Sequence, residues 1–283
     1  MKIELILPQG YCAGVNNAIN IALKARKEHE TANVYVLGML VHNEIVIDLL
    51  KKQNILSISP EELDKLHTGD VLIFTAHGHE EKYDKIAQEK GLIIYDATCP
   101  KVASNIKKIK KEIAAGHQVI YIGQSHHKET VAALSISENV SLYDTKLLIN
   151  YYSITDKSPF IINQTTLNFL ELNDIHKDIK EHIPGARFAN EICNATRQRQ
   201  EAILNISKDT NLIIIVGDKR SSNTTKLYDI AVSNFPNAKV LFVASVEYLK
   251  GLDLSGYKKA AISSGASTPQ FVVDDIYNYL LSK

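Results

Sequence analysis

Short apolar runs recur along this 283-residue chain, for example at residues 34–37, 119–122 and 212–216, and a glycine directly follows each of these three. Runs of this length that are rich in Val and Ile are typical of short strands. Between such runs, apolar residues fall at helical spacing. Residues 106, 109 and 113 are all Ile and would share one face of a helix whose other face carries lysines. Strands that alternate with helices predict an α/β fold with mainly parallel sheets.

The three cysteines occupy one place in a repeated pattern. Each follows a predicted strand and comes just before a predicted helix, in the segments 6–12, 93–99 and 187–193. Cys99 lies 87 residues after Cys12, and Cys193 lies 94 residues after Cys99. A repeat of this kind indicates three copies of one α/β unit.

Polar side chains follow two further sets of predicted strands at nearly the same spacing. One set leads to His42, to His127 with Glu129, and to Ser221, Ser222 and Asn223, and the other leads to His77, Thr165 and Ser267. Ligands of α/β sheets bind beyond the carboxyl ends of the strands. We therefore expect these side chains to surround one central site.

The repeat also predicts the domain organisation. We expect three similar α/β domains at 13–98, 99–192 and 193–283, with an N-terminal strand at 1–12 that leads into the central site. Arranged as a pseudo-threefold trefoil, the domains would bring the three cysteines to a common centre, where they could hold an iron–sulfur cluster.

The number and spacing of the cysteines narrow their chemistry. Three thiols cannot all pair as disulfides, and the closely spaced cysteine pairs typical of structural zinc sites are absent. Iron–sulfur clusters bind thiolates, normally four to a [4Fe-4S] cluster, so three cysteines would leave one iron open to another ligand. The alternative is that each cysteine is a small buried apolar residue, as free cysteine often is.

The polar strand-end residues suit an anionic ligand. His, Ser and Asn side chains at the starts of helices are donors to which a diphosphate could bind, although Ser and Asn there are also ordinary helix caps. Glu129 could hold a proton near neutral pH if it is shielded from water, or it could stabilise the start of its helix. The GxxxxGK[S/T] and GxGxxG motifs are absent, which disfavours bound ATP, nicotinamide and flavin.

Charge and hydropathy limit the kinds of partner that the protein can bind. The 32 Lys and Arg residues balance 32 Asp and Glu residues, so the chain lacks the positive field that attracts nucleic acid. Its apolar runs are far shorter than the roughly 20 residues that span a bilayer, and its first ten residues do not resemble a signal peptide. We expect a cytoplasmic protein that acts on a small molecule and binds neither nucleic acid nor membrane.

Eight ordered motifs together resemble those of the 4-hydroxy-3-methylbut-2-enyl diphosphate reductase family, in a match that runs from residue 6 to about residue 275. They are GYCAGV at 10–15, VHN at 41–43, AHG at 76–78, DATCP at 96–100, QTT at 164–166, ICNAT at 192–196 followed by RQ at 199–200, SSN at 221–223 and GAS at 265–267. The resemblance implies the last step of the non-mevalonate isoprenoid pathway. In that step the substrate diphosphate loses its hydroxyl group reductively and yields isopentenyl diphosphate and dimethylallyl diphosphate.

The resemblance also implies a role for each matching residue. Cys12, Cys99 and Cys193 would be the ligands of a [4Fe-4S] cluster; His42, His77, His127, Thr165, Ser221, Ser222, Asn223 and Ser267 would bind the substrate, most of them through its diphosphate; Glu129 and Thr165 would serve proton delivery. The electrons would come from a carrier such as a ferredoxin or a flavodoxin.

One motif departs from the family pattern, and two other functions stay open. The family usually has His-Pro-Glu where this chain has His127, Lys128 and Glu129, preceded by His126, so the contacts of His126 and Lys128 with the phosphate are undecided. The residues alone also allow an iron–sulfur redox sensor, or a non-redox hydratase with an open-iron cluster.

Overall fold

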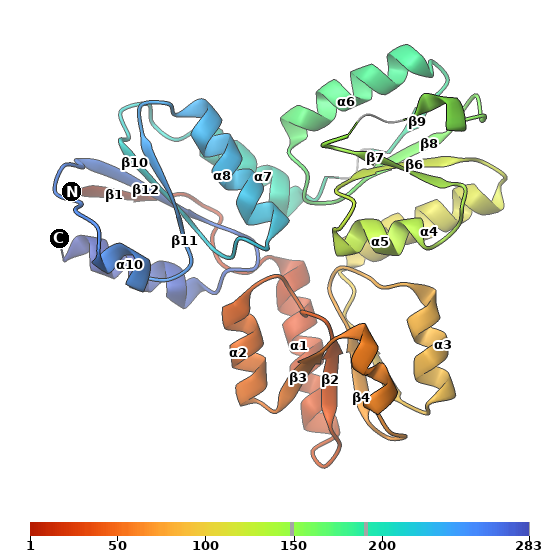
Figure 1. The fold of residues 1–283 in the computed structure, drawn as a ribbon. Helices are drawn as coiled ribbons and strands as arrows, with labels where there is room; N and C mark the ends of the chain where they lie inside the picture. The colour runs from red at the N-terminus through yellow and green to blue at the C-terminus, as the bar shows by residue number, and fades with distance from the viewer. Residues whose placement is uncertain (148–149, 190–191, 283) are drawn as a thin grey trace. The chain divides into compact units, whose positions relative to one another are not determined.

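The computed structural model describes residues 1–147, 150–189 and 192–282, and its strands form three sheets (Figure 1). The β2 sheet contains β2 (Val34–Leu37), β3 (Ile55–Ile58), β4 (Val71–Phe74) and β5 (Ile93–Asp96); the β6 sheet contains β6 (Val119–Gly123), β7 (Val140–Asp144), β8 (Phe160–Asn163) and β9 (Arg187–Phe188); the β10 sheet contains β1 (Lys2–Leu5), β10 (Leu212–Val216), β11 (Lys239–Val243) and β12 (Lys259–Ser264). Every strand pair is parallel. The predicted fold class, an α/β fold with three similar parallel sheets, is confirmed.

Helices connect the strands of every sheet. They are α1 (Ala13–Glu28), α2 (Glu44–Lys52), η1 (Pro60–Lys65), α3 (Glu81–Glu89), α4 (Pro100–Ala114), α5 (Lys128–Leu134), η2 (Tyr151–Ser153), α6 (Phe169–His182), α7 (Asn194–Leu204), α8 (Ser222–Asn234), α9 (Glu247–Lys250) and α10 (Gln270–Leu281). The predicted amphipathic helix is α4, in which Ile109 is fully buried while Lys107 and Lys110 are exposed. In the described part of the chain, no helix is long and apolar enough to cross a membrane.

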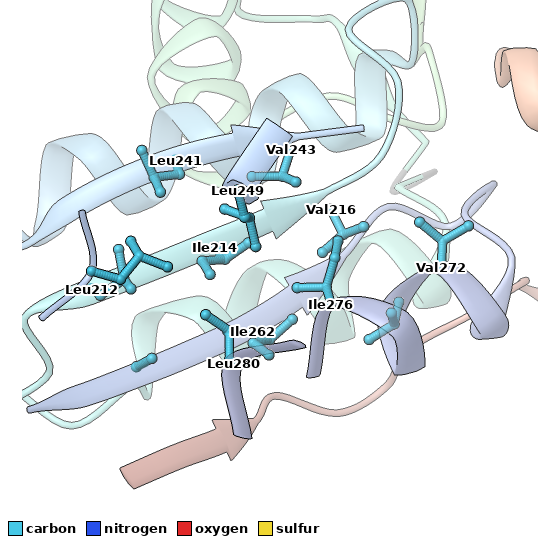
Figure 2. Close-up of a cluster of buried hydrophobic side chains, with 13 residues drawn as sticks. Leu212, Ile214, Val216, Leu241, Val243, Leu249, Ile262, Val272, Ile276 and Leu280 are labelled. Atoms are coloured by element: carbon cyan, nitrogen blue, oxygen red, sulfur yellow. The ribbon is translucent and has the colours of Figure 1, made fainter. Parts of the chain in front are cut away.

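The β10 sheet shows how the apolar runs build the core. All five residues of β10 are buried. Because side chains alternate along a strand, Leu212, Ile214 and Val216 pack with α10 on one face, and Ile213 and Ile215 pack with α7 and α8 on the other. Figure 2 shows the cluster on the α10 face. Covering both faces with helices explains why the run is apolar throughout.

The sequence pattern did not predict three of the strands, namely β3, β7 and β11. The strand orders are β3-β2-β4-β5, β7-β6-β8-β9 and β11-β10-β12-β1, so each missed strand lies at the edge of its sheet. Only a minority of the residues in each of these strands is fully buried. Polar residues interrupt the apolar residues of β3 and β7, whereas β11 has an apolar run at 240–243 that sequence reasoning overlooked.

The N-terminal strand completes a sheet built mostly from the other end of the chain. β1 pairs with β12 in a register that runs from Lys2 opposite Lys259 to Leu5 opposite Ile262. It holds the position in the β10 sheet that β5 and β9 hold in the other two. The edge strands β1, β5 and β9 therefore each precede one of the three cysteines along the chain.

The chain divides into two compact units. The first comprises Met1–Asn16, His42–Asp48 and the chain from Cys193 onward, and the second comprises Asn17–Val41 and Leu49–Ile192. The first unit contains the β10 sheet, and the second contains the β2 and β6 sheets. The expected domain boundaries at 98/99 and 192/193 fall between successive sheets, and they stay a prediction.

Gly265, directly after β12, allows a close approach of that loop to α8. A Cβ atom at this position would overlap Oγ1 of Thr224 and lie 3.0 Å from its Cβ, and Thr224 is fully buried. We expect Gly265→Ala to lower the free energy of unfolding by about 1–3 kcal/mol, the usual cost of overpacking, measured by urea denaturation of the apoprotein. Gly251→Ala, at a glycine with nothing within 4 Å of the added Cβ, is the control and should change stability little.

A second variant tests the cause of this destabilisation. Thr224→Ala removes the overlapping hydroxyl, so the double variant with Gly265→Ala should be more stable than the sum of the two single effects predicts. Additive effects would show that the Gly265–Thr224 contact is not responsible.

Candidate functional site

Each cysteine directly precedes a helix and follows, along the chain, an edge strand of one sheet, namely β1, β5 or β9. The carbonyl groups of Cys12, Cys99 and Cys193 accept hydrogen bonds from the N–H groups of Asn16, Ala103 and Arg197 at 3.0, 2.9 and 2.9 Å. All three side chains are partly exposed, and none is in a disulfide. Helix N-termini and partial exposure favour reactive thiolates, so the alternative of small, fully buried apolar residues does not fit their surroundings.

Cys12 in the first compact unit and Cys99 in the second make equivalent contacts. The N–H group of Cys12 donates to the carbonyl of Ala266, and that of Cys99 donates to the carbonyl of Ala76, both at 3.0 Å. The next residues along those loops are Ser267 and His77. The structure therefore places a predicted donor directly beside a predicted cluster ligand in each unit.

The polar residues after β6 and β10 cap the helices that follow. His127 accepts through Nδ1 from the N–H of Glu129 at 3.2 Å, and the hydroxyl of Ser221 accepts from the N–H of Thr224 at 3.3 Å. Ser222 is the first, partly buried residue of α8. The capping role considered from the sequence is therefore real, and it is compatible with anion binding because helix N-termini present backbone N–H groups to anions.

In the second unit, the two predicted histidines are in contact. The rings of His77 and His127 pack edge to face with their centroids 5.8 Å apart. His127 is 8% exposed, whereas His126 and Lys128 are exposed to solvent. His127 is therefore the buried histidine of this loop, and it is the one that packs against His77. 

Glu129, two residues after His127, is buried and is held at both carboxyl oxygens by Thr165. The N–H of Thr165 donates to Oε2 at 2.9 Å and its hydroxyl donates to Oε1 at 2.8 Å. Burial raises the pKa of Glu129 to about 7, because desolvation of the carboxylate outweighs the two hydrogen bonds from Thr165. A carboxyl group with this pKa holds a proton in a substantial fraction of molecules at neutral pH, as a general acid requires.

In the first unit, His42, Ser221, Asn223 and Ser267 come from segments in contact with one another. The hydroxyl of Ser267 donates to the carbonyl of His42 at 3.3 Å. Asn223 is 4% exposed, and neither its side-chain oxygen nor its side-chain nitrogen has a hydrogen-bond partner in the part of the chain that the structure describes. Buried amides are nearly always hydrogen-bonded, so the side chain of Asn223 has the character of a ligand-binding group.

Sequence reasoning missed a carboxylate that joins these segments. Asp218 accepts from the N–H of Glu44 at 2.9 Å, and from the N–H and Nε of Arg220, each at 2.9 Å. Burial opposes its ionisation, but these hydrogen bonds prevail and lower its pKa. Arg220 also forms an ion pair with Glu44. Asp218 thereby ties the loop that carries His42 to the loop that carries Ser221, and no local pattern in the sequence marks this contact.

The cysteines fit an iron–sulfur cluster by the chemistry of their donors. Three thiols that stand at equivalent positions before α1, α4 and α7 match the thiolate ligands that such clusters require. Among the described residues, no group of three or more His, Cys, Asp or Glu side chains could hold a single metal ion.

Comparison with known proteins identifies the family. The family model for LytB protein matches residues 3–281. This chain belongs to the LytB family. Curated relatives of this LytB protein include the 4-hydroxy-3-methylbut-2-enyl diphosphate reductases of Bacillus licheniformis, with 35% identity over 99% of this chain and 90% of the relative, and of Malacoplasma penetrans, with 32% identity over 100% and 98%.

Solved structures agree with this assignment of the LytB chain. The E-1-hydroxy-2-methyl-but-2-enyl-4-diphosphate reductase from Plasmodium falciparum superposes with a TM-score of 0.89 and 29% identity, covering 99% of this chain and 87% of that structure. A second structure, described as the terminal enzyme of the non-mevalonate pathway, has a TM-score of 0.72 and 28% identity, with full coverage of both chains.

Each unit of this LytB protein thus holds one group of the predicted residues. The first contains Cys12, Cys193, His42, Ser221, Ser222, Asn223 and Ser267, and the second contains Cys99, His77, His127, Glu129 and Thr165. The individual roles of these residues stay predictions.

Proposed function

We propose that this chain reduces 4-hydroxy-3-methylbut-2-enyl diphosphate to isopentenyl diphosphate and dimethylallyl diphosphate. The reaction consumes two electrons and two protons, breaks the carbon–oxygen bond to the hydroxyl group, and releases water. The observation that carries the proposal is the buried carboxyl of Glu129, whose pKa of about 7 lets it carry a proton near neutral pH, in a chain of the LytB family whose His127 accepts from the N–H of Glu129.

The residues of the two units divide the work. The diphosphate would bind to side-chain and helix N-terminal donors. These donors would come from His42, His77, His127, Ser221, Ser222, Asn223 and Ser267. Glu129 would donate a proton to the leaving hydroxyl, and Thr165 would hold its carboxyl group in place. Protonation of the remaining allylic framework at either end accounts for two isomeric products.

A [4Fe-4S] cluster on Cys12, Cys99 and Cys193 would supply electrons singly and offer an open iron to the substrate hydroxyl. A ferredoxin or flavodoxin would deliver the electrons. The carrier's identity and a cytoplasmic location stay predictions.

The test is turnover of anaerobically reconstituted protein with the substrate and a strong one-electron reductant, following cluster absorbance and products together. Formation of both isoprenoid diphosphates supports the proposal. An intact cluster with no turnover would favour the sensor, and turnover independent of reductant would favour the hydratase.

Asp218 provides a separate test of the diphosphate site. Removal of its carboxylate in Asp218→Ala leaves the N–H of Glu44 without its acceptor and loosens the contact between the His42 and Ser221 loops. We expect about tenfold weaker substrate binding, corresponding to about 1.4 kcal/mol, seen as a higher KM with a nearly unchanged kcat.

Two control variants separate this effect from general charge loss. Asp275→Ala removes an exposed carboxylate of α10 and should leave KM unchanged. Glu44→Gln breaks the exposed ion pair with Arg220 but keeps the backbone contact, and exposed pairs contribute little. If Glu44→Gln raised KM as much as Asp218→Ala, the ion pair and not the backbone contact would hold the loops.

A further inference from the structure

Arg199 is a buried arginine that contacts both cysteine-bearing segments of the first unit. It lies on α7, six residues after Cys193, and is 2% exposed. Its Nη2 donates to the carbonyl of Gly10 at 2.8 Å, and its Nη1 donates to the carbonyl of Ala195 at 3.1 Å. Gly10 lies two residues before Cys12, and Ala195 lies two residues after Cys193. One side chain therefore joins two ligand segments that are 181 residues apart in the sequence.

The charge of Arg199 is poorly compensated by the protein. Both acceptors are neutral carbonyl groups, and the buried Nε has no hydrogen-bond partner among the residues that the structure describes. In residues 1–147, 150–189 and 192–282, no ion pair joins Arg199 to a carboxylate. Burial lowers the pKa of Arg199, and negative charge at Cys12 and Cys193 opposes that shift. A buried guanidinium stays charged, and burying a charge without a counter-charge is unfavourable. The missing counter-charge therefore belongs at the cysteines.

A cluster bound by thiolates would supply that negative charge. Its reduction adds a further electron, and a nearby buried positive charge stabilises the reduced form more than the oxidised form, because electrostatic interactions are strong in a low-dielectric interior. Hydrogen bonding and local charge are among the factors that set cluster potentials. Arg199 is placed to act in this way from within the protein, opposite the solvent-exposed side of α7.

We propose that Arg199 is a positioning residue that holds the Cys12 and Cys193 segments together and raises the reduction potential of the cluster through its buried positive charge. The inference rests on the proposed cluster, and it concerns a residue that need not touch the substrate.

The test compares the midpoint potential of anaerobically reconstituted wild-type, Arg199→Met and Arg199→Lys proteins in a redox titration without substrate. Methionine keeps most of the volume and removes the charge, whereas lysine keeps the charge and loses the fork of donors. We expect Arg199→Met to favour the oxidised cluster at least tenfold, a fall of about 59 mV for one electron. Arg199→Lys should show less than half of that shift. Arg197→Met removes a charge from the partly exposed face of the same helix and is the matched control, with a small shift.

Iron content and thermal unfolding of each apoprotein are measured in parallel. An Arg199→Met protein that holds a full cluster at the wild-type potential overturns the proposal. If this variant folds but loses iron, the lysine variant decides: retention of iron supports the role of charge, and equal loss overturns it. The outcome is separable from the proposed function, because a wild-type cluster that forms without turnover contradicts only the reaction, whereas a wild-type protein that forms no cluster overturns both.

Discussion

Glu129→Gln is expected to lower kcat by at least about 100-fold, the usual effect of losing a general acid, while substrate affinity and iron content stay close to wild type. The glutamine side chain has nearly the same shape and can accept one of the two hydrogen bonds from Thr165. It cannot release a proton to the leaving hydroxyl group. Single-turnover kinetics with a pre-reduced protein would measure the chemical step directly.

The pH dependence follows from the same carboxyl group. Since the pKa of Glu129 is raised to about 7, the proton-donating form dominates below that pH and is lost above it. Wild-type kcat should therefore fall as the pH rises through about 7, and the Glu129→Gln protein should lack this limb. The shift also makes the folded protein bind this proton more tightly than the unfolded chain, so the group's contribution to stability falls as the pH rises from 4.5 towards 7.

A nearby exposed glutamate is the control for this substitution. Glu138→Gln makes the same substitution at a solvent-exposed glutamate and should leave kcat and its pH profile unchanged. A Glu129→Gln protein with normal turnover would remove Glu129 from the mechanism and shift attention to a proton relay through the diphosphate.

Cys193→Ser is expected to lose most of the bound iron and sulfide and to lower turnover by more than about 100-fold. Losing an outer partner of a metal ligand already costs about 10–100-fold, and serine is a poor substitute for a thiolate at iron. Cys12→Ser and Cys99→Ser should behave alike, because the three cysteines hold equivalent positions before α1, α4 and α7. Iron analysis and cluster absorbance after anaerobic reconstitution measure the loss.

Thiol labelling separates loss of the cluster from loss of the fold. The chain contains three cysteines, so the wild-type apoprotein should react at three thiols and the reconstituted protein at fewer. Apoproteins of the serine variants should unfold near the wild-type temperature. A Cys193→Ser protein with full iron content and normal activity would contradict the ligand assignment, and a colourless wild-type protein that binds zinc would contradict the cluster itself.

Much of the fold could be predicted because its central strands are buried on both faces. The runs at β6 and β10, for instance, are apolar throughout and stand out from the helical segments around them. The edge strands β3 and β7 were not predicted in this way because polar residues interrupt their apolar residues, whereas β11 has an apolar run at 240–243 that sequence reasoning overlooked.

The candidate site was predictable where function requires a residue type at a strand end. Cysteine, histidine and serine recur there at nearly constant spacing, and local chemistry explains why each suits a thiolate ligand or an anion donor. The state of Glu129 was only partly predictable. Its carboxyl type was visible in the sequence, but its raised pKa comes from burial that the fold creates.

By itself, the sequence determined the α/β class, the threefold repeat and the set of polar residues that end the strands, since these depend on local periodicity and residue type. Only the tertiary structure decided that β1 completes the β10 sheet, that Asp218 holds the N–H of Glu44, and that Arg199 joins the segments of Cys12 and Cys193. These contacts link residues more than 170 positions apart in the sequence. Their hydrogen bonds and charges depend on which segments the folded core brings together, and no local pattern along the chain encodes that choice.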